Sequence, residues 1–180
     1  MRNDAADQPA GNGHPLLATG IVGGVLLADQ LTKLWAVRRL ADGPVALAGD
    51  TVSFRLARNT GSAFSLFQAF TPLLALVAIG VAVFLVRAVR QARDVLLVVG
   101  LSLVLGGALG NLSDRLFRTP GFLHGGVVDF VHVGAWPTFN VADSAITSGA
   151  VLIVVWAVRA DRRERRAARA DPGHEVHRRG

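Results

Sequence analysis

Two aspartates in the second half of the chain are the first candidates for chemistry. Asp129 interrupts an apolar run at residues 127–131, where a carboxyl group has a raised pKa unless a partner stabilises its charge. Asp143 follows a loop containing Pro137, which can turn the chain back toward Asp129. Two carboxylates held together in a poorly solvated site share one proton near neutral pH. Such a pair can hydrolyse an amide, because one acid takes a proton from the attacking water while the other protonates the leaving nitrogen.

Two other kinds of hydrolytic site, a Ser-His-Asp triad and a metal site, could be formed by nearby serines, histidines and aspartates. A Ser-His-Asp triad would use Ser113 or Ser144 with His124 or His132, although neither serine lies in a G-x-S-x-G turn. A metal site built from these histidines and the aspartates would lack the H-E-x-x-H spacing of zinc hydrolases. The chain contains no cysteine, so thiol nucleophiles, disulfides and Cys-based metal sites are excluded.

Further polar residues lie at the ends of apolar stretches, where an ionisable group is costly and is therefore a functional hypothesis. Asp29 and Lys33 have the i,i+4 spacing of a helical ion pair, and Lys33 is the only lysine in the chain. With the topology derived below, every residue of this set falls at the same membrane interface, which makes the set a candidate functional site. Its members are Asp29, Lys33, Asn59, Asn111, Asp114, Arg115 and Asn140.

Several of these residues also have a purely structural interpretation. The i, i+3, i+4 spacing places Asn111, Asp114 and Arg115 on one helical face, where they could mark a membrane interface. Asn140 is suited to an N-cap with Asp143 at N3, as in a capping box, so capping and catalysis both remain open for Asp143. Asn59, in the segment Arg-Asn-Thr-Gly, is a candidate turn residue.

Four apolar stretches must position these groups. They cover about residues 16–37, 70–86, 95–112 and 141–158, within a chain that is 51% hydrophobic and 18% charged with a mean hydropathy of +0.42. A membrane-spanning helix needs about 20 mostly apolar residues. Four such helices in 180 residues would leave a soluble particle too little polar surface. The sequence therefore predicts four transmembrane helices.

Arginines near the ends of the spans predict the orientation. Arg87, Arg90 and Arg93 lie between the second and third spans, and a basic tail follows the fourth span, on the same side. Basic residues favour the cytoplasmic side, so we expect both termini inside and the polar residues at the outer interface. Arg38, Arg39, Arg55 and Arg58 on the outer side are exceptions. Because the other basic residues form a tail rather than a folded basic face, nucleic-acid binding is disfavoured.

Two segments remain outside, at about residues 38–69 and 115–139. Alternation at residues 45–47 and 52–56, broken by Gly49 and Asp50, predicts a small hairpin or sheet on the outer membrane face. The predicted fold class is thus an all-α membrane protein with four transmembrane helices and a small β-rich segment on the extracytoplasmic face. We expect a flexible N-terminus (1–14), a single membrane-embedded domain (15–159) and a disordered or interfacial basic tail (160–180) whose arginines could bind anionic lipid.

Five sequence blocks in a fixed order resemble lipoprotein signal peptidase (signal peptidase II), a bacterial membrane protease. No single block would be specific, but five blocks spread from residue 29 to residue 144 are. They are DQLTK at 29–33, NTGSAF at 59–64, GGALGNLSDR at 106–115, VVDF at 127–130 and FNVADS at 139–144.

The resemblance implies a function and a role for each matched residue. Asp129 and Asp143 would be the catalytic pair of an aspartic endopeptidase in the bacterial plasma membrane. The surrounding residues Asn111, Arg115 and Asn140 would position the pair or the substrate, and Asp29, Lys33, Asn59 and Asp114 would support the site. The substrate would be a prolipoprotein that carries diacylglyceryl on its lipobox cysteine, with cleavage just before that cysteine.

The resemblance also bears on ligands and on competing functions. It implies no metal or organic cofactor, and it implies inhibition by the peptide antibiotic globomycin. We expect a monomer surrounded by membrane lipid. The alternative functions are a non-enzymatic transporter or proton-relay protein, which would need polar residues at mid-span on several helices, and a structural or lipid-binding membrane protein.

Overall fold

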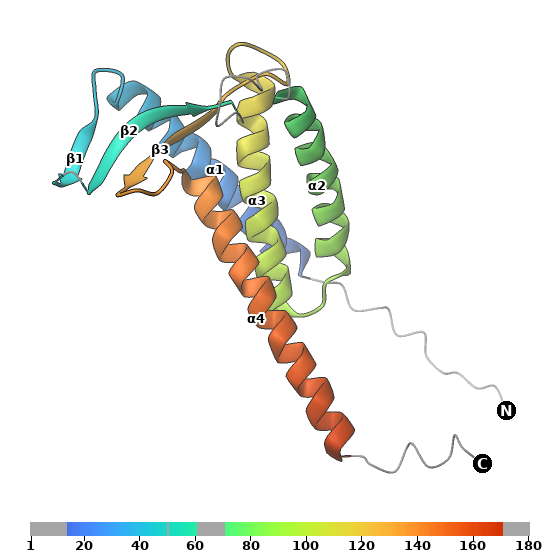
Figure 1. Cartoon of the computed structure of the whole chain (residues 1–180). Helices are drawn as coiled ribbons and strands as arrows, with labels where there is room; N and C mark the ends of the chain where they lie inside the picture. Colours follow the sequence, from blue (N-terminus) through green and yellow to red (C-terminus); the bar gives the residue numbers. More distant parts are fainter. Residues whose placement is uncertain (1–13, 50, 61–70, 171–180) are drawn as a thin grey trace.

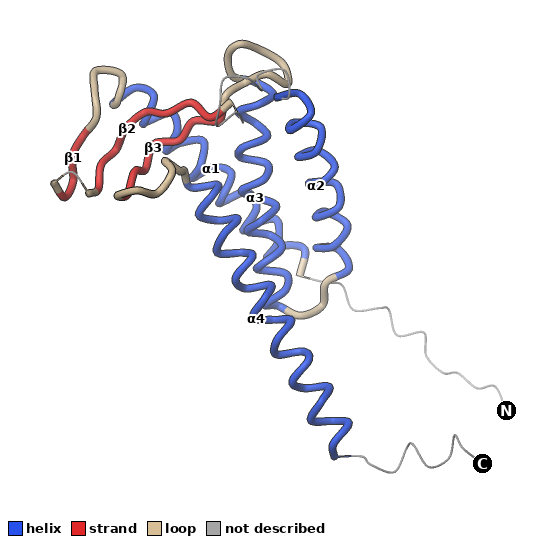
Figure 2. Tube along the Cα trace, in the orientation of Figure 1, coloured by secondary structure: helices blue, strands red, loops and turns tan. Residues whose placement is uncertain are grey.

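The computed structural model describes residues 14–49, 51–60 and 71–170. Four helices make up most of this part: α1 (Pro15–Arg39), α2 (Thr71–Gln91), α3 (Val95–Phe117) and α4 (Val141–Ala170). Three strands, β1 (Val45–Ala48), β2 (Val52–Asn59) and β3 (Val127–Val133), form one sheet at one end of the helices (Figures 1 and 2). All four helices are long and apolar enough to cross a membrane, which confirms the predicted fold class.

The helices extend beyond the apolar stretches from which they were predicted. The third helix continues past Leu112 to Phe117 and so includes Asp114 and Arg115. The fourth continues through the basic segment to Ala170, so the disordered alternative for the tail is wrong for residues 160–170. Several predicted features lie outside the described residues: residues 1–13 of the flexible N-terminus predicted at 1–14, residues 61–64 of the second sequence block, Phe70 of the second span, and tail residues 171–180.

Local sequence signals explain where the helices begin. Pro15 occupies the first turn of α1, where its missing N–H is not needed. Asp94 caps α3, since its carboxylate accepts hydrogen bonds from the N–H groups of Leu96 (2.8 Å) and Leu97 (3.3 Å). The Asp94 cap satisfies two backbone donors that would otherwise be left unpaired at the start of α3.

Helix α3 is the centre of the bundle. Half of its apolar stretch is buried, whereas the other three helices bury 11–17% of theirs. It packs against α1, α2 and α4, and small residues make this possible: a Cβ on Gly106 would lie 2.8 Å from Val25 of α1, and one on Gly107 would collide with the backbone oxygen of Ala142 of α4. The glycines of this tract therefore allow close packing of α3 against α1 and α4.

The sheet has the order β1-β2-β3, and both pairs are antiparallel. The predicted hairpin is confirmed, with Gly49 in its turn at φ +54°, a conformation that glycine adopts without strain. Strand β3 was not predicted; it pairs with β2 from Val52↔Val133 to Asn59↔Val127. The sheet rests on the end of α1, where Ala36 and Leu40 form a buried cluster with Phe130. Because β3 carries Asp129, this contact positions that acid relative to the helices.

Substitution of Gly107 tests the close approach of α3 and α4. We expect Gly107→Ala to lower the free energy of unfolding by about 1–3 kcal/mol, because the added methyl group meets backbone that cannot move independently. Gly80→Ala on α2 is the matched control, since a Cβ there meets nothing within 4 Å. Thermal unfolding in detergent should show a lower midpoint for Gly107→Ala only; equal midpoints would contradict the packing.

Candidate active site

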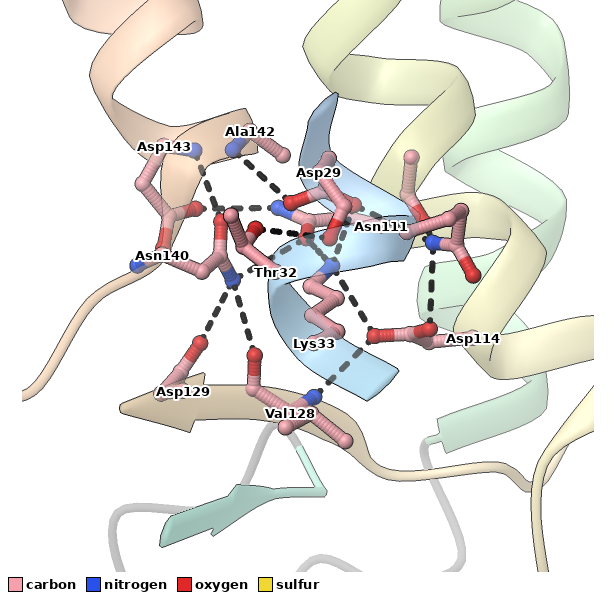
Figure 3. A network of polar contacts seen from close by, with 12 residues as sticks. Asp29, Thr32, Lys33, Asn111, Asp114, Val128, Asp129, Asn140, Ala142 and Asp143 are labelled. Atoms are coloured by element: carbon pink, nitrogen blue, oxygen red, sulfur yellow. Dashed lines mark hydrogen bonds and ion pairs between the residues drawn. The ribbon is translucent and has the colours of Figure 1, made fainter. Parts of the chain in front are cut away.

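A buried cluster of charges lies around Lys33, between α1 and α3 (Figure 3). The Nζ of Lys33 is 2.8 Å from Asp29 Oδ2 and 2.9 Å from Asp114 Oδ2, and it donates a hydrogen bond to Asn111 Oδ1 at 2.9 Å. The side chains of Lys33, Asp29 and Asp114 are all 0% exposed. The predicted i,i+4 ion pair is therefore present, but it is buried and has a second carboxylate from another helix.

The two carboxylates of this cluster also hold the backbone of other elements. Asp29 Oδ1 accepts a hydrogen bond from the N–H of Ala142 in the first turn of α4, at 3.0 Å. Asp114 Oδ2 accepts one from the N–H of Val128 in β3, at 3.1 Å. The cluster thus joins α1 and α3 to the two elements that carry Asp143 and Asp129.

Two residues of the cluster were not predicted. Arg118 donates from Nε to Asp114 Oδ1 at 2.6 Å, and the i,i+4 spacing of this pair on α3 could have indicated it. Gln30 donates to Asp29 Oδ2 at 3.1 Å and to the backbone oxygen of Gly110 at 3.2 Å. A Cβ on Gly110 would lie 2.6 Å from Asp29 Oδ2, so glycine is required for α3 to approach this carboxylate.

Helix α4 begins with the predicted capping box. Asn140 Oδ1 accepts a hydrogen bond from the N–H of Asp143 (2.9 Å), and Asp143 Oδ2 accepts one from the N–H of Asn140 (3.1 Å). The other oxygen of Asp143 accepts a hydrogen bond from Asn111 Nδ2 at 2.9 Å. Capping and membership of the polar site are therefore compatible, because Asp143 uses a different oxygen for each.

Asn140 also contacts Asp129, on the neighbouring strand. The Nδ2 of this fully buried asparagine donates to Asp129 Oδ1 at 2.6 Å, and it also lies 3.2 Å from Asn111 Oδ1 and 3.3 Å from the backbone oxygen of Val128. A single residue thus bonds to both aspartates, through its side-chain nitrogen to Asp129 and through its backbone N–H and side-chain oxygen to Asp143 (Figure 3).

The surroundings of Asp129 change its proton affinity. Burial, and then repulsion by the charge of Asp143, raise the pKa of Asp129 from its ordinary 3.8 to about 6. Hydrogen bonds from the side chains of Asn140 and Asn59, and the positive charge of Lys33, oppose part of this rise in the pKa. An acid with a pKa near neutrality can hold a proton in one step of a reaction and release it in another.

The remaining predicted residues, Asn59 and Arg115, lie beside the acids. Asn59 is the last residue of β2, paired with Val127, so its interpretation as a turn residue is wrong; its side chain hydrogen-bonds Asp129 instead. The half-buried guanidinium of Arg115 interacts electrostatically with Asp114 and Asp129. Its buried Nη1 has no hydrogen-bond partner among the described residues.

The residues of the alternative sites make other contacts. Ser144 Oγ donates to the backbone oxygen of Asn140 at 3.0 Å, and His124 Nδ1 lies 2.8 Å from the backbone oxygen of Phe122. Within residues 14–49, 51–60 and 71–170, no three His, Cys, Asp or Glu side chains come together as potential metal ligands.

Comparison with known proteins identifies the family. Residues 21–159, most of the chain, match the sequence model of signal peptidase (SPase) II. The chain belongs to the signal peptidase II family. A lipoprotein signal peptidase of Rhodococcus jostii is 53% identical over 163 residues, covering 86% of this chain and 81% of the relative. One from Mycobacterium tuberculosis is 41% identical over 175 residues, covering 84% and 87%.

Solved structures agree with this membership of the signal peptidase II family. Two bacterial membrane enzymes superpose with a TM-score of 0.68 at 25% and 26% sequence identity. The matches cover 82% and 81% of this chain and 91% and 95% of those proteins. The same arrangement of helices and sheet therefore occurs in solved membrane enzymes.

Substitution of Lys33 tests the charge cluster. We expect Lys33→Met to lower the free energy of unfolding by about 3–5 kcal/mol, because it leaves buried carboxylates without their shared cation. Arg165→Met is the matched control: it breaks an i,i+4 pair with Asp161 whose side chains are 73% and 54% exposed, and it should cost at most about 0.5 kcal/mol. Unfolding in detergent measures both values. If both variants lost a similarly small free energy of unfolding, the Lys33 cluster would not be a major source of stability.

Proposed function

We propose that Asp129 and Asp143 are the catalytic pair of this membrane protease. The chain is an aspartic protease of the signal peptidase II family, whose named relatives are lipoprotein signal peptidases, and it cleaves the signal peptides of lipoproteins. The observation that carries the proposal is the contact of buried Asn140 with both acids. This contact holds one acid from β3 and one from α4 around a common point.

The pKa of Asp129 and the hydrogen bonds of Asp143 support different roles for the two acids, with Asp129 as the proton donor and Asp143 as the base. Asp129, with a pKa of about 6, is suited to hold the single proton that the pair retains near neutral pH. Asp143 accepts hydrogen bonds on both oxygens, from Asn111 and from the backbone of Asn140, which suits an ionised acid. In this assignment Asp143 takes a proton from the attacking water, and Asp129 protonates the amide nitrogen that leaves.

The position of the acids suits a lipid-anchored substrate. They lie where α4 begins and β3 passes the helix ends, next to the sheet (Figures 1 and 3). A prolipoprotein with diacylglyceryl on its cysteine can keep its acyl chains in the bilayer while the bond before that cysteine reaches this end of the bundle. We infer this substrate from the resemblance of the five sequence blocks, together with this placement.

The arginines support an orientation in the bacterial membrane. Arg87, Arg90 and Arg93 lie around the connection between α2 and α3, at the end of the bundle away from the sheet, and the basic end of α4 lies on the same side (Figure 1). This side is then cytoplasmic and the sheet extracytoplasmic. The buried polar network lies beside β3 and the start of α4 (Figure 3), whereas a transporter or proton relay would need polar residues at mid-span on several helices.

Amide substitutions test the two acids. We expect Asp129→Asn and Asp143→Asn each to reduce cleavage of a diacylglyceryl lipobox peptide by about 10³-fold or more, since an amide neither accepts nor supplies the required proton. Asp161→Asn, at an exposed position on α4, is the matched control and should retain full activity. Thermal midpoints should confirm that all three variants are folded. Full cleavage by either site variant would overturn the assignment.

The pH dependence of cleavage tests the shared proton. Because the pKa of Asp129 is raised, the protonated form is present below about pH 6 and is lost as the pH rises through this value. We therefore expect kcat/KM to fall on the alkaline side of about pH 6, by about tenfold per pH unit. Initial rates between pH 4.5 and about pH 8 in buffers of constant ionic strength measure this limb. A flat profile over this range would contradict the proposal.

A further inference from the structure

We propose that the outward face of α1, near the sheet, binds an anionic phospholipid from the adjacent leaflet. A groove of about 420 Å³ lies on this face, lined by Leu31, Leu34, Trp35, Arg38 and Arg39. In the described part of the chain, no side-chain hydrogen bond or ion pair joins these residues to Asp29, Lys33, Asn111, Asp114, Asp129, Asn140 or Asp143. The site is therefore separate from the proposed catalytic pair.

The spacing of the lining residues places them on the lipid-facing side of the helix. Leu31 is followed at i+3, i+4, i+7 and i+8 by the other four residues, which is one stripe of an α-helix. The opposite side of α1 is buried against the protein, at Asp29, Lys33 and Ala36. Leu31 remains 56% exposed, Leu34 44% and Trp35 43%. Because α1 spans the membrane, a lipid is the molecule that meets this stripe.

The order of residues along the stripe matches the order of groups in a phospholipid. Arg38 lies about 10 Å farther along the helix axis than Leu31, at 1.5 Å per residue. The leucines thus meet acyl chains, Trp35 lies at the level where aromatic rings favour the interface, and the arginines reach the headgroups. The 25 residues of α1 extend about 37 Å, more than the ~30 Å hydrocarbon layer, so its last turn can lie among headgroups.

The positive charges of Arg38 and Arg39 favour a lipid with an anionic headgroup. Arg38 and Arg39 are exposed, and none of the ion pairs between described residues involves either of them. Two adjacent guanidinium groups without a carboxylate partner are suited to bind a phosphate, with which they form paired hydrogen bonds. They are also exceptions to the general preference of arginine for the other side of the membrane, and a bound anionic lipid gives them a role.

The groove is connected to the sheet through Trp35. The ring of Trp35 makes edge contacts with Phe54 of β2 at 5.3 Å and with Phe130 of β3 at 6.2 Å between centroids. Phe130 follows Asp129 in the chain and belongs to the cluster that seats the sheet on α1. A lipid packed against Trp35 therefore supports the contact between α1 and the strand that carries one of the two acids.

Lipid binding to the purified full-length chain tests this site without relying on protease activity. The chain in detergent micelles is titrated with phosphatidylglycerol or phosphatidylcholine, and bound lipid is counted by native mass spectrometry. We expect Arg38→Gln combined with Arg39→Gln to weaken phosphatidylglycerol binding about 30-fold, which is about 2 kcal/mol for two surface arginines. Arg55→Gln combined with Arg58→Gln removes the same charge from exposed positions of β2 and should leave this binding within about threefold of the unmodified chain.

Thermal unfolding of the unmodified chain provides a second readout. A lipid that binds the folded state raises the unfolding midpoint, so phosphatidylglycerol should raise it more than phosphatidylcholine does, and the Arg38/Arg39 double variant should lose the difference. Equal effects of the two lipids on the unmodified chain would overturn the proposal. Equal weakening by the Arg38/Arg39 and Arg55/Arg58 pairs would overturn it too, because it would show a general effect of surface charge.

Discussion

The structure depends on the ion pairs and the hydrogen bond that stabilise one fully buried ammonium group, that of Lys33. Lys33 has three N–H donors, and three acceptors surround it: Asp29 on its own helix, and Asn111 and Asp114 on α3. A buried charge without such partners would cost several kcal/mol, so α1 and α3 can pack only in a register that supplies them. The same two carboxylates also bind backbone N–H groups: Asp29 accepts from Ala142 of α4 through its other oxygen, and Asp114 accepts from Val128 of β3 through the oxygen that contacts Lys33. One cation thereby sets the positions of four elements.

The same cation also orients Asn111, one of the two amides that donate to the acids. Because Asn111 presents its oxygen to Lys33, its nitrogen is directed to Asp143. Asn140 presents its oxygen to the first turn of α4, so its nitrogen is directed to Asp129. Each acid therefore receives a donor whose orientation is decided elsewhere in the network. Such preorganised polar groups do not need to rearrange when charge moves during a reaction.

The sequence predicted the features that depend on local pattern. The four spans, the hairpin and the capping box of Asn140 follow from hydropathy, alternation and cap chemistry, which act over a few residues. Pairing of β3 with β2 was not predicted, because Asp129 interrupts the apolar alternation and its partners lie far away in the chain. The second carboxylate at Lys33 was missed for the same reason: Asp114 is near it only after α1 and α3 pack. The structure brings the polar residues of the matched blocks together, but which of them contact one another could not be read from the sequence.

In the proposed site, Asp129 and Asp143 share one proton on either side of Asn140. Infrared spectroscopy of the chain in lipid measures this directly, because a protonated carboxyl group has its own C=O stretching band. We expect one such band, which disappears as the pH rises through about 6, the pKa of Asp129, and which is absent at about pH 5 in Asp129→Asn. A band that persists unchanged in that variant, or the absence of any carboxyl group titrating in this range, would contradict it.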